Sequence, residues 1–172
     1  AAEVTRDTQD KAAPALARVI DDVLSKRKGE KGIIHTHSFD LLKAVVPSIK
    51  TQDRLIIQGS GNRAEVIKEF KERTDDCWLV SPSVAHGEDF SYDMARNQII
   101  LKMPFVDLSD KVARIRLRQK PKWYKYKTVQ TLVQMLGRVT RAADDYGESV
   151  IVDAKFEAIL PFMPEEIKKA IQ

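Results

Sequence analysis

The chain is poor in cysteine and has no long apolar run. Cys77 is its only cysteine, which excludes intrachain disulfides and any zinc or iron–sulfur site built from several cysteines. A single thiol fits a reducing cytosolic compartment. No apolar stretch approaches the ~20 residues that cross a bilayer, and no secretion signal opens the chain, so we expect no membrane partner.

Internal repeats, low-complexity tracts and interdomain linkers are also absent from the sequence. With 172 residues, of which 43% are hydrophobic and 31% charged, the chain is expected to form one globular domain with a substantial core. Its formal charge of +4 favours a polyanionic partner. Because the chain begins with Ala1 rather than Met, we expect a fragment or a processed product.

Short apolar strands alternate with helical segments along the chain. Strands are expected over residues 32–36, 54–58, 78–80, 98–103 and 150–153, and helices over 9–27 and 39–50, after Asn62, between the last two strands, and after Pro164. Such alternation predicts an α/β fold, in which a parallel sheet is covered by helices on both faces. Ligands of these folds bind at the carboxyl ends of the strands.

The stretch TLVQMLGRVTR predicts a helix that presents two arginines. At helical spacing Gln134, Arg138 and Arg141 share one face, opposite an apolar face. Two planar guanidiniums on a rigid helix suit the oxygens of a polyphosphate and the charge that develops in phosphoryl transfer. The alternative is two surface arginines paired with Asp144 and Asp145.

Residues 111–127 form the most basic part of the chain. Arg114, Arg116 and Arg118 alternate with Ile115 and Leu117, which predicts an extended segment with one basic face. Such a face can follow a phosphate backbone while interleaved aromatic residues stack on bases, so Arg114 and Arg116 are candidate nucleic-acid ligands. The alternative is a solvated edge whose aromatic residues pack on the core.

Four motifs in register resemble one protein family. QMLGRVTR is similar to the last conserved motif of superfamily 2 helicases, Q-x-x-G-R-x-x-R, and the following DDYG, with Asp153 and Phe156, resembles the XPD/DinG-like group. SPSVAHGEDF is similar to the motif before it, although His86 replaces the usual Glu. NQIILKMPF resembles the strand that follows, and GIIHTHSFDLL resembles the start of the second motor domain.

This resemblance implies that residues 1–172 are the C-terminal, second RecA-like domain of a helicase, a three-layer fold with a mainly parallel sheet. ATP and Mg²⁺ would bind in a cleft shared with an N-terminal RecA-like domain that this chain lacks, because it contains no G-x-x-x-x-G-K-[ST] loop. Arg138 and Arg141 would be catalytic arginine fingers. Gln134, Gly87 and Asp89 would contact the nucleotide or line the cleft.

The resemblance also implies that nucleic acid runs across loops of this domain. Backbone phosphates would be gripped by the first strand-to-helix motif and by the loop before Gly87. The residues at these places are Thr36, His37, Ser38, Ser81 and Ser83. The alternative is that Ser38 caps a helix and Ser81 satisfies a turn.

The function expected of the complete protein is that of an ATP-dependent DNA helicase, with single-stranded DNA as partner and RNA as a second possibility. The chain alone should be inactive. We expect a cytoplasmic location, with nucleoid association in a prokaryote and a nuclear location as the alternative. His35 and His37 lack accompanying ligands, so no metal site is expected. The other hypotheses are a non-hydrolysing RecA-like module that binds nucleic acid or protein, and an unrelated α/β enzyme.

Overall fold

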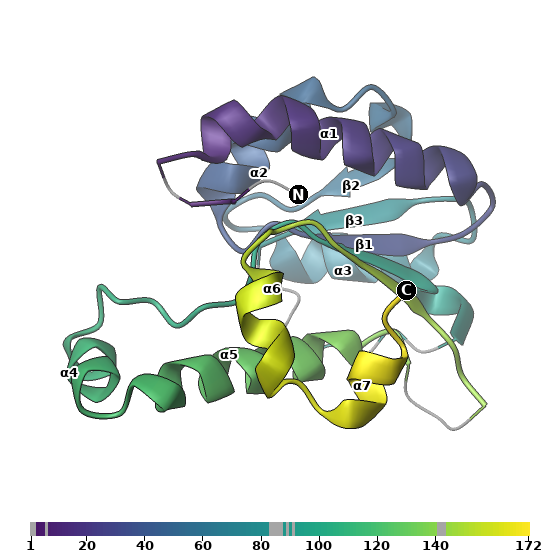
Figure 1. Ribbon diagram of the computed structural model, residues 1–172. Helices are drawn as coiled ribbons and strands as arrows, with labels where there is room; N and C mark the ends of the chain where they lie inside the picture. Colours follow the sequence, from purple (N-terminus) through teal and green to yellow (C-terminus); the bar gives the residue numbers. More distant parts are fainter. Residues whose placement is uncertain (1–2, 6, 83–87, 89, 91, 141–143) are drawn as a thin grey trace.

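A sheet of parallel strands lies between two layers of helices (Figure 1). The computed structural model describes residues 3–5, 7–82, 88, 90, 92–140 and 144–172. The strands are β1 (Gly32–His35), β2 (Leu55–Ile57), β3 (Trp78–Ser81), β4 (Asn97–Ile100) and β5 (Glu148–Ile151), in the order β2-β3-β1-β4-β5. All four pairings are parallel. The predicted α/β class with a parallel sheet is therefore confirmed.

Helices cover both faces of the sheet. The α-helices in the described part of the chain are α1 (Gln9–Lys26), α2 (Phe39–Val45), α3 (Arg63–Glu72), α4 (Lys111–Gln119), α5 (Pro121–Leu136), α6 (Phe156–Ile159) and α7 (Glu165–Lys169). Short 3-10 turns occur at Val46–Ser48, Gln52–Arg54, Tyr92–Met94 and Leu160–Phe162. Helices α1 and α2 pack on one face, whereas α3, α5 and α6 pack on the other (Figure 1). No helix in the described part of the chain is long and apolar enough to cross a membrane.

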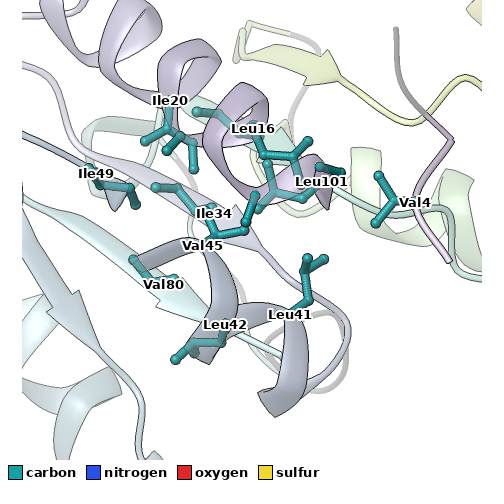
Figure 2. Packing of buried hydrophobic residues seen from close by; sticks show 14 of the residues in the cluster. Val4, Leu16, Ile20, Ile34, Leu41, Leu42, Val45, Ile49, Val80 and Leu101 are labelled. Atoms are coloured by element: carbon teal, nitrogen blue, oxygen red, sulfur yellow. The ribbon is translucent and has the colours of Figure 1, made fainter. Parts of the chain in front are cut away.

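The core above the sheet joins α1 and α2 to the central strands. Leu16 and Ile20 of α1 meet Ile34 of β1, and Leu41 and Val45 of α2 complete the cluster (Figure 2). All five side chains are buried. Full burial of such a side chain contributes roughly 1.5–3 kcal/mol, so this interface is a main source of stability.

The core below the sheet has two parts. Phe70 of α3 packs with Ile33 and Leu79 of the central strands, and Leu132 of α5 packs with Ile100 of β4. The side chains of Ile33 and Ile34 therefore point to opposite faces, as alternation along a strand requires. A sheet with apolar groups on both faces needs both helical layers.

Helix α5 ends earlier than the sequence pattern predicts. Its last residue is Leu136, and Gly137 is the C-cap, so Arg138 lies beyond the helix. The prediction that Arg138 shares a helical face with Gln134 is wrong, because the helix stops before Arg138. Arg141, the third residue of that prediction, lies outside the described residues. Glycine is a common residue at the end of a helix, and here it is the C-cap.

The basic segment after β4 is a helix rather than an extended strand. The carboxylate of Asp110 accepts a hydrogen bond from the Val112 backbone N–H at 2.7 Å and caps α4. The prediction of one basic face is therefore wrong: Arg114 and Arg118 lie one turn apart on the same face of the helix, while Arg116 lies on a different face. Helix α4 lies away from the sheet (Figure 1), and Ala113 is its one buried residue.

Smaller differences concern the ends of elements. Strand β4 ends at Ile100, before the predicted end at residue 103. Helix α2 gives way to a 3-10 turn that contains Pro47. Asn62 precedes α3 as predicted but makes no side-chain cap; its Oδ1 accepts from the Gly59 N–H at 2.7 Å.

Candidate functional site

The carboxyl ends of β1 and β3 meet at one place on the sheet edge. The Thr36 backbone N–H donates to the Ser81 carbonyl oxygen at 3.1 Å, so two predicted nucleic-acid ligands lie side by side. Both side chains are fully buried. The Thr36 hydroxyl donates to the Ser38 carbonyl oxygen at 3.1 Å, and the Ser81 hydroxyl donates to Gln58 Oε1 at 2.5 Å. Both hydroxyls therefore stabilise the loops that follow β1, β2 and β3 through buried hydrogen bonds.

The next two residues are more accessible. His37 and Ser38 are partly buried, and His37 has a φ of 60°, a left-handed conformation that is uncommon for a residue other than glycine. The Ser38 hydroxyl accepts from the Leu41 N–H at 3.1 Å and caps α2, as the alternative interpretation predicted. This turn therefore has a fixed shape between β1 and α2.

Arg138 is fixed to the segment around Glu88. Its Nη1 donates to the Glu88 carbonyl oxygen at 2.8 Å, and its own carbonyl oxygen accepts from the Phe90 N–H at 3.3 Å. The Glu88 carboxylate accepts from Lys71 Nζ at 2.8 Å and lies 3.9 Å from the guanidinium of Arg63. The segment that carries Arg138 is thereby tied to the segment at Glu88 and to α3.

A buried histidine lies near Arg138 at the end of β1. Burial, with smaller contributions from the charges of His37 and Arg138, lowers the pKa of His35 to about 3, although a hydrogen bond to Gln98 opposes this. His35 is therefore neutral at ordinary pH. Its Nε2 lies 3.0 Å from Gln98 Oε1, an acceptor, so Nε2 carries the proton.

The other predicted site residues are spread out. Gln134 is exposed on the last turn of α5. Arg114 and Arg116 lie on α4, away from the strand ends, and the Arg116 guanidinium lies 5.5 Å from the centre of the Trp123 ring. The remaining predicted residues, Arg141, Gly87, Asp89 and Ser83, lie outside the described residues.

Metal ligands do not gather in the described part of the chain: no group of three or more His, Cys, Asp or Glu side chains there is arranged to hold an ion. Cys77 is buried, and burial raises the pKa of its thiol. This thiol packs in the apolar cluster with Phe70, as a small apolar residue does.

Sequence reasoning missed three polar contacts. Gln98 is buried between the sheet and the end of α5, the carbonyl of Glu88 holds Arg138, and Arg96 Nη1 pairs with the buried carboxylate of Asp145 at 2.6 Å. The available signal for Gln98 was an amide side chain at the start of an apolar strand. A contact made by a backbone carbonyl leaves no signal in residue identities, so the role of Glu88 could not be found in this way.

The parallel sheet, its two helical layers and the strand order define a RecA-like α/β domain. A family model described as the helicase C-terminal domain matches residues 21–170. The chain therefore belongs to the family of helicase C-terminal domains. Together with the sequence relative described next, this match identifies it as an XPD/DinG-like member of superfamily 2, which confirms the resemblance of the motifs.

Individual relatives agree with this family. The chain is 28% identical over 156 residues to the 3'-5' exonuclease DinG of Bacillus subtilis (strain 168), covering 82% of this chain and 17% of that protein. Two solved structures share the fold. Xpd4 of S. tokodaii has a TM-score of 0.67 and 15% identity, and the match covers 96% of this chain and 35% of that chain. An XPD helicase has a TM-score of 0.67 and 14% identity, and the match covers 91% of this chain and 30% of that chain. The chain thus spans about a sixth of the curated relative and about a third of each structure.

Proposed function

We propose that this chain is the second RecA-like domain of an ATP-dependent helicase, and that Arg138 acts as an arginine finger toward ATP bound between it and an N-terminal RecA-like domain. The observation that carries the proposal is the attachment of Arg138 to the Glu88–Phe90 segment through two hydrogen bonds. Because one guanidinium nitrogen and the backbone of Arg138 are both held, little further conformational entropy is lost when the side chain meets a phosphate. Arg141, three residues further on, is proposed as a second finger from its motif alone.

The proposed nucleotide site is completed by the other domain. Because this chain has no Walker A loop, the phosphates and Mg²⁺ would be held by the N-terminal domain. Gln134, which is exposed, would face the nucleotide or that domain, and Gly87 and Asp89 would line the cleft. In this arrangement the guanidinium of Arg138 stabilises charge that develops on the terminal phosphate.

Single-stranded DNA is the proposed nucleic-acid partner, held by its backbone at the carboxyl ends of β1 and β3. Since the hydroxyls of Thr36 and Ser81 are fully buried, the side chains proposed for phosphate contact are the more accessible ones of His37 and Ser38, and Ser83 by its place in the sequence. The Ser38 hydroxyl accepts a hydrogen bond as the cap of α2 and can still donate its proton. The basic side chains of α4, including Arg114, add a second, more distant contact. Binding of RNA with equal affinity would widen the substrate class.

The decisive experiment measures ATP turnover of the complete protein carrying Arg138→Ala or Arg138→Lys. We expect kcat to fall by about 10³-fold or more in both, because lysine keeps the charge but not the planar fork. Arg73→Ala is the matched control, since Arg73 pairs with Asp75 on the surface at the end of α3. The isolated 172-residue chain should hydrolyse ATP negligibly.

Near-wild-type turnover of the folded Arg138 variants would contradict the finger assignment. Retained nucleic-acid binding by a complete protein that does not hydrolyse ATP would favour the second candidate, a binding module without catalytic function. Circular dichroism of each variant separates loss of activity from loss of fold.

A further inference from the structure

The side chain of Gln98 connects three elements beneath the sheet. It is 1% exposed. Its Nε2 lies 2.8 Å from the Ser149 hydroxyl oxygen of β5, 3.3 Å from the Met135 carbonyl oxygen and 3.5 Å from that of Leu136, both of α5. One N–H can serve Ser149 and the other can be shared between the two carbonyls. The amide thus uses its donors on β5 and α5.

On the other side, Gln98 holds the end of β1. Its Oε1 accepts from His35 Nε2 at 3.0 Å, and the imidazole is buried and neutral. The chain continues from His35 directly into the turn at His37, where the backbone is left-handed, and to the cap of α2. The orientation of the imidazole is therefore linked to the start of the β1–α2 loop, residues 36–38.

The contact with α5 lies where Arg138 leaves the helix. The last carbonyl groups of a helix have no partners within it, and Gln98 shares one N–H between two of them. The Met135 carbonyl oxygen also accepts from the Arg138 N–H at 2.9 Å. Gln98 and Arg138 thus bind the same carbonyl, and a shift of one changes the position available to the other.

We propose that Gln98 is a positioning residue that couples the β1–α2 loop to Arg138 through His35 on one side and the end of α5 on the other. The inference rests on the proposed function, since it gives that loop a nucleic-acid contact and Arg138 a role in hydrolysis. A buried polar network with all its partners in place is rigid, because moving one member leaves another unsatisfied. Movement of the loop on binding nucleic acid is therefore passed to Arg138 rather than absorbed.

The test uses Gln98→Met in the complete protein. Methionine matches glutamine in length and is apolar, so the packing is kept while both connections are lost. ATP hydrolysis is measured with and without saturating single-stranded oligo(dT). We expect stimulation by the oligonucleotide to fall about tenfold, within the usual range of coupling between sites. The KM for ATP and the Kd for oligo(dT) without nucleotide should change by less than about threefold, since Gln98 touches neither ligand.

Two further variants separate coupling from packing. His35→Phe removes the donor to Gln98 but leaves the contacts with α5, and it should also lose the stimulation. His35→Gln restores a donor and should recover most of it. Asn97→Leu is the matched control: Asn97 precedes Gln98 on β4, is 4% exposed and donates to Glu30 Oε2 at 2.6 Å on the opposite side of the strand. This control should lower the melting temperature without changing the stimulation ratio.

The outcomes distinguish the inference from the proposed function. The inference is overturned if folded Gln98→Met and His35→Phe proteins are stimulated by oligo(dT) as strongly as the wild type. It is also overturned if oligo(dT) does not stimulate ATP turnover of the wild-type protein. If Gln98→Met does not fold, the comparison of His35→Phe with His35→Gln decides. Full turnover by Arg138→Ala, or no turnover by the wild type, overturns the proposed function instead.

Discussion

Arg138 contacts the backbone of Glu88 and not its carboxylate: Nη1 of Arg138 lies 2.8 Å from the Glu88 carbonyl oxygen. The carboxylate of the same residue reaches in another direction, to Lys71 of α3 at 2.8 Å. Glu88 thus connects the segment after α5 with α3, through its backbone carbonyl to Arg138 and through its carboxylate to Lys71. Only the connection through the carboxylate can be removed by changing the side chain.

Replacement of Glu88 by alanine should therefore leave Arg138 in place. We expect ATP turnover of the complete protein within about twofold of wild type, provided that the backbone path is kept. Loss of the partly exposed ion pair with Lys71 should cost less than about 1 kcal/mol of unfolding free energy. Steady-state hydrolysis and urea unfolding measure the two effects. A loss of turnover as large as that of Arg138→Ala would mean that the carboxylate itself acts in the site.

Gly32 lies against the indole of the central core. A Cβ added to Gly32 would overlap the six-membered ring of Trp78, which is fully buried. Gly32→Ala should destabilise the domain by about 1–3 kcal/mol, as overpacking does. In Gly61→Ala the added methyl meets no atom within 4 Å, so this control should change stability by less than ~0.5 kcal/mol. Thermal unfolding of both variants checks the difference.

The stability of the domain should fall on mild acidification because of His35. Its pKa is lowered from 6.5 to about 3 in the folded chain, so between these values the unfolded chain binds a proton that the folded chain does not. Stability from this group is complete above pH 6.5 and is lost as the pH falls toward 3. Between pH 7 and pH 5 the expected loss is about 2 kcal/mol.

His35→Phe isolates this effect from that of the carboxylates, which titrate in both proteins. Urea unfolding at pH 7 and pH 5 should show a smaller drop for the variant than for the wild type, by about the same 2 kcal/mol. Equal drops in the two proteins would show that the imidazole is protonated, or accessible to water, in the folded state.

Arg114 on α4 should contribute to binding single-stranded DNA through charge alone. It is exposed, and removal of one phosphate contact lowers the slope of log affinity against log salt by about 0.7 on single strands. Arg114→Ala in the complete protein should show this change for oligo(dT) by fluorescence anisotropy. Lys68→Ala removes an exposed charge from α3 and should leave the slope unaltered. An unchanged slope for Arg114→Ala would place α4 outside the binding surface.

The strands and their parallel arrangement could be predicted because each is a short apolar run between turn residues. Ile33 and Ile34 face different layers, and a run apolar on both faces is typical of a buried parallel strand. The class of fold follows from this pattern alone. The family could be predicted as well, since its motifs are carried by residue identities at fixed spacings.

The ends of the helices and strands and the buried polar contacts were harder to predict from the sequence. Alternation of Arg114, Ile115 and Arg116 imitates a strand, whereas the cap at Asp110 and the helix propensity of arginine decide for a helix. Gly137 was a stop signal within an apparently continuous helical pattern. The pairing of His35 with Gln98 joins positions far apart in the chain, and neither residue by itself indicates the other.

The strand order has a consequence for synthesis of the chain on the ribosome. The central strand β1 pairs with β3 and β4, both of which are translated well after it. Until Asn97–Ile100 leaves the exit tunnel, β1 has one neighbouring strand at most, and one edge of this central strand remains unpaired. Nascent chains that stop before β4 should therefore be the species that chaperones retain.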